Sequence, residues 1–136
     1  MRRVLRRKVL TAFSLLAFSV MFSGAFSRPH AAELLMFESP GCPWCLMWHR
    51  QIGPIYPKTP ESKIAPLRRI VLSKDMPLDI SLSSPVVATP TFVLVENGKE
   101  IGRLTGYKDE ASFWGLLGVL LQKLPDAERA AGRRTL

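Results

Sequence analysis

The chain has 136 residues and a formal net charge of +8, with 47% hydrophobic and 22% charged residues. This length allows one domain with a core of ordinary size and excludes a multidomain enzyme. The composition is that of a globular protein, so it excludes an intrinsically disordered chain and a collagen-like repeat. A positive charge of this size would suggest a nucleic-acid partner, but that inference depends on where the basic residues lie.

The N-terminus has the pattern of an export signal. Five basic residues and no acidic one stand among the first eight residues, and an apolar run follows over residues 9–22. Small residues come next as far as Ala25, so the sequence predicts a signal peptide over residues 1–25. An uncleaved membrane anchor is the alternative, because residues 9–26 form a mostly apolar stretch close to the length that crosses a bilayer.

Most of the positive charge belongs to this leader. It holds five of the 19 basic residues and none of the 11 acidic ones, so the rest of the chain carries a formal charge of only +3. The remaining basic residues are scattered and do not alternate with aromatic residues as in single-strand binding grooves. We therefore expect no nucleic-acid partner and an exported, periplasmic protein, in a compartment where disulfides persist.

The exported part begins with elements of an α/β fold. The apolar run at residues 33–38 predicts a buried strand that ends in a Ser-Pro-Gly turn. A helix is expected over residues 43–52, because proline suits the first helical position and no helix breaker follows before Gly53. Residues 67–72 predict a second strand, and the order strand, helix, strand implies a parallel pair.

The second half of the domain predicts a hairpin and a helix. Strand-like residues 91–96 and 99–105 are separated by Asn97-Gly98, which indicates a type I′ turn because both central residues need positive φ. A helix is expected from Asp109 to the residue before Pro125. Its apolar residues recur at helical spacing and are expected to face the core: Phe113, Leu116, Leu117, Leu120, Leu121 and Leu124.

Three segments carry weaker signals. The proline-rich residues 53–66 predict a surface connection with at most one helical turn, at residues 60–64. Residues 73–87 are rich in turn formers without a clear period, so their structure is left open. Residues 125–136 are expected to form a loose polar tail.

Cys42 and Cys45 stand at positions i and i+3 at the start of the predicted helix. The unpaired N–H groups and the positive dipole end of a helix stabilise a thiolate at Cys42, while Cys45 lies one turn further in and should be less exposed. We therefore expect Cys42 to attack a substrate disulfide. Cys45 would then resolve the mixed disulfide and leave the pair oxidised.

Other roles for this pair stay open from the residues alone. A structural disulfide is disfavoured because so short a loop removes little entropy from the unfolded chain. Copper or zinc binding for delivery would use His49, but the other histidine, His30, lies near the leader and only three ligands are local. An inert pair is the third alternative. Redox chemistry is favoured, with no metal and no cofactor beyond the Cys42–Cys45 disulfide.

The order of these features resembles the thioredoxin-like thiol–disulfide oxidoreductases. The shared features are the strand, the helix start Cys42-Pro43-Trp44-Cys45, Thr89-Pro90-Thr91 before the hairpin, and Gly106 before a terminal helix. The resemblance covers residues 33–124 and implies a trimmed thioredoxin-like α/β fold, a central mixed sheet of about four strands flanked by helices. Within the family the chain is most similar to the small periplasmic thioredoxins of bacterial sulfur-oxidation systems, which implies a role in keeping a sulfur-carrier partner reduced.

The resemblance also implies a substrate-binding site. Pro90 would be a cis-proline beside the cysteine pair, Thr89 would contact the substrate backbone, and Gly106 would let that chain approach closely. Pro43 and Trp44, between the cysteines, would complete the site. The substrate would be a protein disulfide, and an oxidising cell envelope would require a membrane electron donor to recycle the pair.

The chain departs from the family pattern at three places. Only seven residues separate Ala25 from Glu33, which leaves no room for the N-terminal strand and helix of typical thioredoxins. Met36 stands where cytosolic thioredoxins have a buried aspartate. The pair Pro43-Trp44 replaces Gly-Pro and resembles glutaredoxins and some periplasmic isomerases, so the redox potential of thioredoxins does not transfer to this chain. A disulfide oxidase or isomerase is the second enzymatic hypothesis.

Overall fold

The computed structural model describes residues 32–72 and 77–134. The expected signal peptide or anchor falls on residues 1–31 and lies outside the described residues. Along the described chain, no helix combines the length and the apolar character needed to cross a membrane. The elements in chain order are β1 (Ala32–Glu38), α1 (Pro43–Gln51), the 3-10 helix η1 (Tyr56–Lys58), α2 (Pro60–Ile64), β2 (Leu67–Val71), β3 (Thr91–Glu96), β4 (Lys99–Thr105), α3 (Glu110–Leu121) and α4 (Asp126–Arg133).

Strands β1 to β4 form one mixed sheet in the order β2-β1-β3-β4. Strand β1 runs parallel to β2 and antiparallel to β3, which confirms the expected strand, helix, strand crossover through α1. Strands β3 and β4 form the predicted hairpin, and Asn97 and Gly98 both have positive φ, 50° and 75°. The fold is the expected trimmed α/β domain with a four-stranded mixed sheet.

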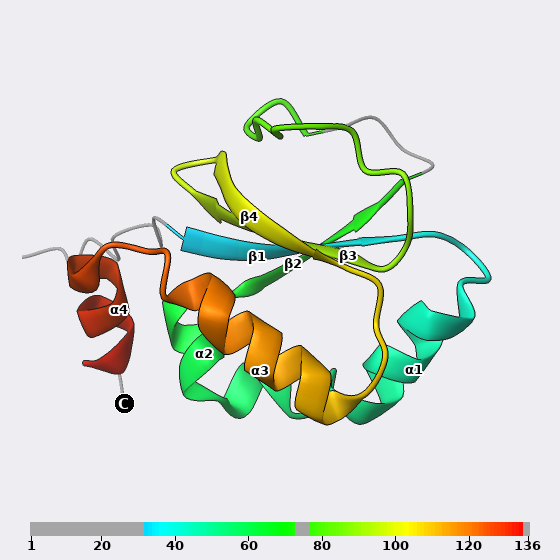
Figure 1. Cartoon of the computed structure of the whole chain (residues 1–136), viewed down its shortest axis with the longest axis horizontal. Coiled ribbons are helices and arrows are strands. Elements are labelled where there is room, and N and C mark those ends of the chain that lie inside the picture. The colour runs from blue at the N-terminus through cyan, green and yellow to red at the C-terminus, as the bar shows by residue number, and fades with distance from the viewer. Residues whose placement is uncertain (1–31, 73–76, 135–136) are drawn as a thin grey trace, which may run out of the picture.

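The two faces of this sheet are covered in different ways (Figure 1). Helices α1, α2 and α3 lie on one face, toward which Leu34 and Met36 of β1 point. The neighbouring residues Leu35 and Phe37 point to the other face, because side chains alternate along a strand. The irregular residues 77–90 cover that second face with three partly buried side chains, Ile80, Leu82 and Val86.

Trp48 of α1 lies at the centre of the core on the helical side. Its side chain is fully buried, and its ring centroid lies 5.3 Å from that of Phe92, 5.7 Å from that of Phe113 and 6.4 Å from that of Tyr56. Trp48 follows Cys45 by three residues on the same helix. This aromatic packing therefore fixes the position of α1, and with it the cysteine pair, above the sheet.

The apolar stripe of α3 is narrower than expected. Five of its six members are buried, but Leu116 is 54% exposed. At 100° per residue Leu116 lies roughly 60° to one side of Phe113, about 40° beyond the nearest other member, Leu120, so it falls at the margin of the stripe. The assignment of Leu116 to the core was wrong, because spacing alone does not say how wide the contact with the sheet is.

The expectation of a loose polar tail was also wrong, because residues 126–133 form α4. Asp126 and Glu128 stand in its first turn, where acidic side chains favour the helix dipole. The helix packs closely on α2: a Cβ built on Gly132 would lie 2.7 Å from Cα of Ile64. Glycine permits this approach of two backbones, so the tail gains a partner that its polar composition did not indicate.

Candidate active site

Cys42 and Cys45 form a disulfide with a Cα–Cα distance of 5.3 Å. Cys42 is the N-cap of α1, Pro43 occupies the first turn, and the backbone N–H of Cys45 donates to Sγ of Cys42 at 3.1 Å. The predicted position of Cys42 at a helix start is therefore confirmed. When the disulfide is reduced, this N–H and the helix dipole stabilise negative charge on the Cys42 sulfur.

The surroundings of the two cysteines differ only slightly in burial. Cys42 is 8% exposed and Cys45 is 3% exposed, so Cys45 is the more buried residue, as expected. Between them Trp44 is 51% exposed. The disulfide thus lies at the edge of the core beside an exposed aromatic ring.

The predicted substrate-binding residues come together next to the cysteine turn. The Thr89–Pro90 peptide bond is cis, as the resemblance implies. The hydroxyl oxygens of Thr89 and Ser39 lie 2.8 Å apart, and Ser39 precedes Cys42 in the turn after β1. The backbone N–H of Gly106 donates to the carbonyl of Pro90 at 2.7 Å, and the φ of Gly106 is +85°, which favours glycine.

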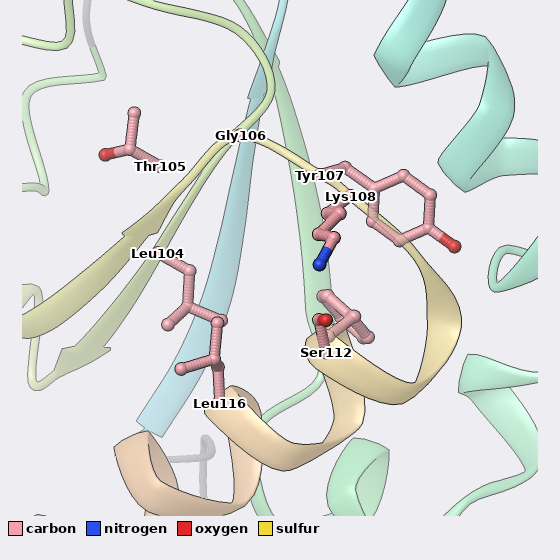
Figure 2. A pocket seen from close by; sticks show the side chains of 8 residues that line it. Leu104, Thr105, Gly106, Tyr107, Lys108, Ser112 and Leu116 are labelled. Carbon is pink, nitrogen blue, oxygen red and sulfur yellow. The ribbon is translucent and has the colours of Figure 1, made fainter.

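A groove of about 320 Å³ extends from Gly106 between the end of β4 and α3 (Figure 2). The side chains of Leu104 and Leu116 lie together at one end, and Tyr107 points toward α1, where its hydroxyl donates to Oε1 of Gln51 at 2.6 Å. Burial raises the pKa of Tyr107, with Glu110 and Asp109 adding to the shift. Gly106 is the one predicted site residue in this groove, and neither cysteine lines it.

A buried carboxylate that contacts α1 was not among the predicted site residues. Glu38, the last residue of β1, is 7% exposed; its Oε2 lies 2.6 Å from Nε2 of His49, and its Oε1 accepts from Nε of Arg69 at 2.9 Å. His49 lies one turn beyond Cys45 on α1. Met36, at the position of the family aspartate, is fully buried on the same face of β1. This face therefore carries a carboxylate, Glu38, two residues after Met36. The one feature of the sequence that could have indicated this buried carboxylate is that an acidic residue ends the apolar run.

His49 was also the local candidate for a metal ligand. Within residues 32–72 and 77–134, no three histidine, cysteine, aspartate or glutamate side chains form a group that could hold a metal ion. His49 instead contacts Glu38.

An ion pair on β4 holds the segment that leads to Thr89. Nε and Nη2 of Arg103 donate to the two carboxylate oxygens of Glu100 at 2.7 and 2.6 Å. The backbone N–H of Ser83 also donates to Glu100, at 2.8 Å. The hydrogen bonds from Arg103, with a smaller contribution from Ser83, lower the pKa of Glu100 from 4.5 to about 2.

We expect this pair to give the protein an acid-labile component of stability. The folded-state pKa of Glu100 lies below its unfolded value, so its contribution is complete above pH 4.5 and is lost as the pH falls toward about 2. Glu100→Gln should lower the free energy of unfolding at neutral pH and flatten its decline over this acid range. Urea unfolding at a series of pH values measures both effects. Glu96→Gln is the control, and an equal flattening in that variant would contradict the assignment.

Comparisons with known proteins agree with this geometry. The sequence matches the family described as thioredoxin-like domain over residues 27–120. One similar solved structure is the periplasmic thioredoxin SoxS from Paracoccus pantotrophus in its reduced form, which is 43% identical in sequence. The match covers 68% of this chain and 97% of the SoxS chain, with a TM-score of 0.66. A thioredoxin-fold protein from Helicobacter pylori is 20% identical and covers 77% of this chain and 84% of its own, with a TM-score of 0.51, which supports the fold alone.

Among curated proteins, none matches the chain significantly. The expected similarity to small periplasmic thioredoxins is nevertheless confirmed by the similarity to SoxS, whose chain is covered almost completely. The family match, the disulfide at the start of α1 and the cis bond before Pro90 all agree. The chain belongs to the family of thioredoxin-like domains.

Proposed function

We propose that the protein is an exported thiol–disulfide oxidoreductase that reduces disulfides, or mixed disulfides, on a protein partner. The observation that carries the proposal is the disulfide between Cys42, at the N-cap of α1, and Cys45, in a chain whose cis bond before Pro90 follows Thr89, a residue in contact with Ser39 of the turn before Cys42. The similarity to a periplasmic thioredoxin supports the exported location, together with the leader pattern of residues 1–25.

The chemistry is dithiol–disulfide exchange. In the reduced protein the Cys42 thiolate attacks one sulfur of the substrate disulfide, whose S–S bond breaks, and the departing substrate thiolate takes up a proton. Cys45 then loses its proton and attacks the Cys42 sulfur of the mixed disulfide, which releases the second substrate thiol. Two electrons pass to the substrate, and the protein ends the cycle with the Cys42–Cys45 disulfide that the structure describes.

The residues around the disulfide would bind the substrate chain. Thr89 and Pro90 lie beside the turn before Cys42, and Gly106 lies beside Pro90 without a side chain to obstruct an approaching backbone. The exposed ring of Trp44 would provide apolar contact for residues next to the substrate cysteine, with Pro43 shaping the same turn.

The partners follow from the redox direction. A reductant in an oxidising cell envelope needs a source of electrons, so we propose a membrane electron donor that reduces the Cys42–Cys45 disulfide after each cycle. By similarity to the sulfur-oxidation thioredoxins, the substrate would be a sulfur-carrier protein. Residues 1–25 would deliver the protein to this compartment or anchor it to the membrane there.

A trapping experiment tests the proposal. Cys45→Ala removes the resolving thiol, so the mixed disulfide between Cys42 and the partner should accumulate and be released by dithiothreitol. The variant is produced with its own leader, and adducts are separated on non-reducing gels and identified by mass. Cys42→Ala is the matched control and should trap no partner. If Cys45→Ala captures no protein, the proposal is wrong.

The second enzymatic candidate is a disulfide oxidase or isomerase, which the Pro43-Trp44 pair favours by similarity to glutaredoxins and periplasmic isomerases. The reduction potential of the Cys42–Cys45 pair separates the two: about −270 mV is typical of thioredoxin, and about −120 mV of a strong periplasmic oxidant. A metal-delivery module is the contrasting class. Tightly held stoichiometric copper or zinc on the reduced protein would favour it.

A further inference from the structure

The segment that leads to the cis-proline has little regular structure of its own. Residues 77–90 cover the second face of the sheet, and a single bridge between Ser81 and Lys99 joins them to β4 in the manner of a strand. Three of their side chains are partly buried against that face. A segment without a continuous backbone ladder depends on individual anchors for its position.

One of these anchors is Arg103 of β4, which binds the segment a few residues before Thr89. Besides its two bonds to Glu100, its Nη2 donates to the carbonyl of Ser84 at 2.9 Å and its Nη1 to the carbonyl of Pro85 at 3.3 Å. The side chains of Arg103 and Glu100 are only 20% and 5% exposed. The planar guanidinium thus joins β4 to two successive carbonyls of the segment, a geometry that its fork of donors allows.

The other end of this stretch is held at the cysteine turn. The hydroxyl of Thr91 donates to the carbonyl of Ala88 at 2.7 Å, and the hydroxyl of Thr89 contacts that of Ser39. Only Val86 and Val87 therefore lie between the carbonyls bound by Arg103 and the residues fixed beside the disulfide. Val87 is 91% exposed, so it contributes little burial of its own to hold this stretch.

We propose that Arg103, oriented by Glu100, is a positioning residue for substrate binding: it fixes Ser84 and Pro85 and thereby the place of Thr89 and Pro90. The inference rests on the proposed function. Arg103 contacts neither cysteine in the described interactions, so it acts through the segment and not on the sulfur atoms. Without Arg103 the segment samples other positions. The fraction of molecules in which Thr89 and Pro90 are placed to bind the substrate chain therefore falls.

The test compares two substrates. Arg103→Ala should raise the KM for insulin by roughly tenfold, as expected if about a tenth of the molecules stay competent to bind. Insulin is a suitable substrate because its disulfides lie in a polypeptide that Thr89 and Pro90 would have to bind. The kcat for insulin should stay within about twofold of that of the wild type. The rate with a small aromatic disulfide should not change, because that substrate needs only the Cys42 sulfur. The KM of Arg103→Lys for insulin should lie between those of the wild type and Arg103→Ala. An ammonium can pair with Glu100 but lacks the forked donors that bind two carbonyls at once.

Arg68→Ala is the matched control. Arg68 makes a similar two-bond contact, at 2.6 and 3.2 Å, with Asp79 at the far end of the same segment. Its removal should leave both substrates unaffected. An equal rise in KM in Arg68→Ala, or an equal loss of rate with both substrates in a folded Arg103→Ala or Arg103→Lys protein, would overturn the role of Arg103. A wild-type protein that reduces neither substrate would overturn the proposed function and this role with it.

Discussion

Replacing Cys42 by serine should lower catalysed disulfide reduction by at least about a thousandfold, to the rate of the added reductant alone. A serine hydroxyl is not ionised at neutral pH and cannot form a disulfide with the substrate, so the first step of the exchange is lost. Cys45→Ser should keep this first step. It should consume one equivalent of substrate in a single turnover and then stop as a mixed disulfide, which mass spectrometry detects.

The two serine variants control each other. Each removes the same disulfide and leaves one free cysteine, so any loss of stability from the missing cross-link is common to both. A difference in single-turnover rate between them therefore reports the separate roles of the two sulfur atoms. If Cys42→Ser reacted with substrate as fast as Cys45→Ser, the assignment of Cys42 as the attacking residue would be wrong.

The largest effect on stability is expected at Trp48. Trp48→Ala should lower the free energy of unfolding by about 3–5 kcal/mol, because it empties the space between three aromatic rings. Trp48→Phe should cost much less. It keeps a ring in the core and removes the indole N–H, which is buried and has no hydrogen-bond partner among the residues that the structure describes. Urea unfolding, followed by far-UV circular dichroism, measures both variants.

Trp44→Ala is the control for this pair of variants. Trp44 stands four residues earlier on α1 but is half exposed, so its loss should change stability by no more than about 0.5 kcal/mol. A cost for Trp48→Ala no larger than that for Trp44→Ala would contradict the central place of Trp48 in the core. A cost for Trp48→Phe equal to that for Trp48→Ala would contradict the expectation that an aromatic ring at this position holds the core together.

Several elements were predictable because their signals are local. The helix after Cys42 begins where Pro43 supplies the required φ without needing a hydrogen bond, and the hairpin turns where Asn97 and Gly98 tolerate positive φ. Each depends on the preferences of a few neighbouring residues. The cis bond before Pro90 followed from the family resemblance and is confirmed, but it could not be derived from the residues alone.

Other features depend on surroundings that the local pattern does not contain. The start of α4 carried helix signals, with Pro125 followed by acidic residues, but its polar composition gave no sign of a packing partner. That partner is α2, approached at Gly132. Leu116 had the spacing of a core residue but lies at the margin of the face that the sheet covers. Residues 77–87 had no period because they cover a sheet as irregular chain.

The amino-acid sequence alone therefore located the cysteine pair, its position at a helix start and the succession of strands and helices along the chain, because these depend on residues a few positions apart. The folded chain decided which distant groups meet. Thr89 reaches Ser39, 50 residues away, and Arg69 reaches Glu38, 31 residues away. Arg103 likewise reaches the carbonyl of Ser84. Strand register and the path of an irregular segment set these contacts, and neither leaves a periodic pattern in the sequence.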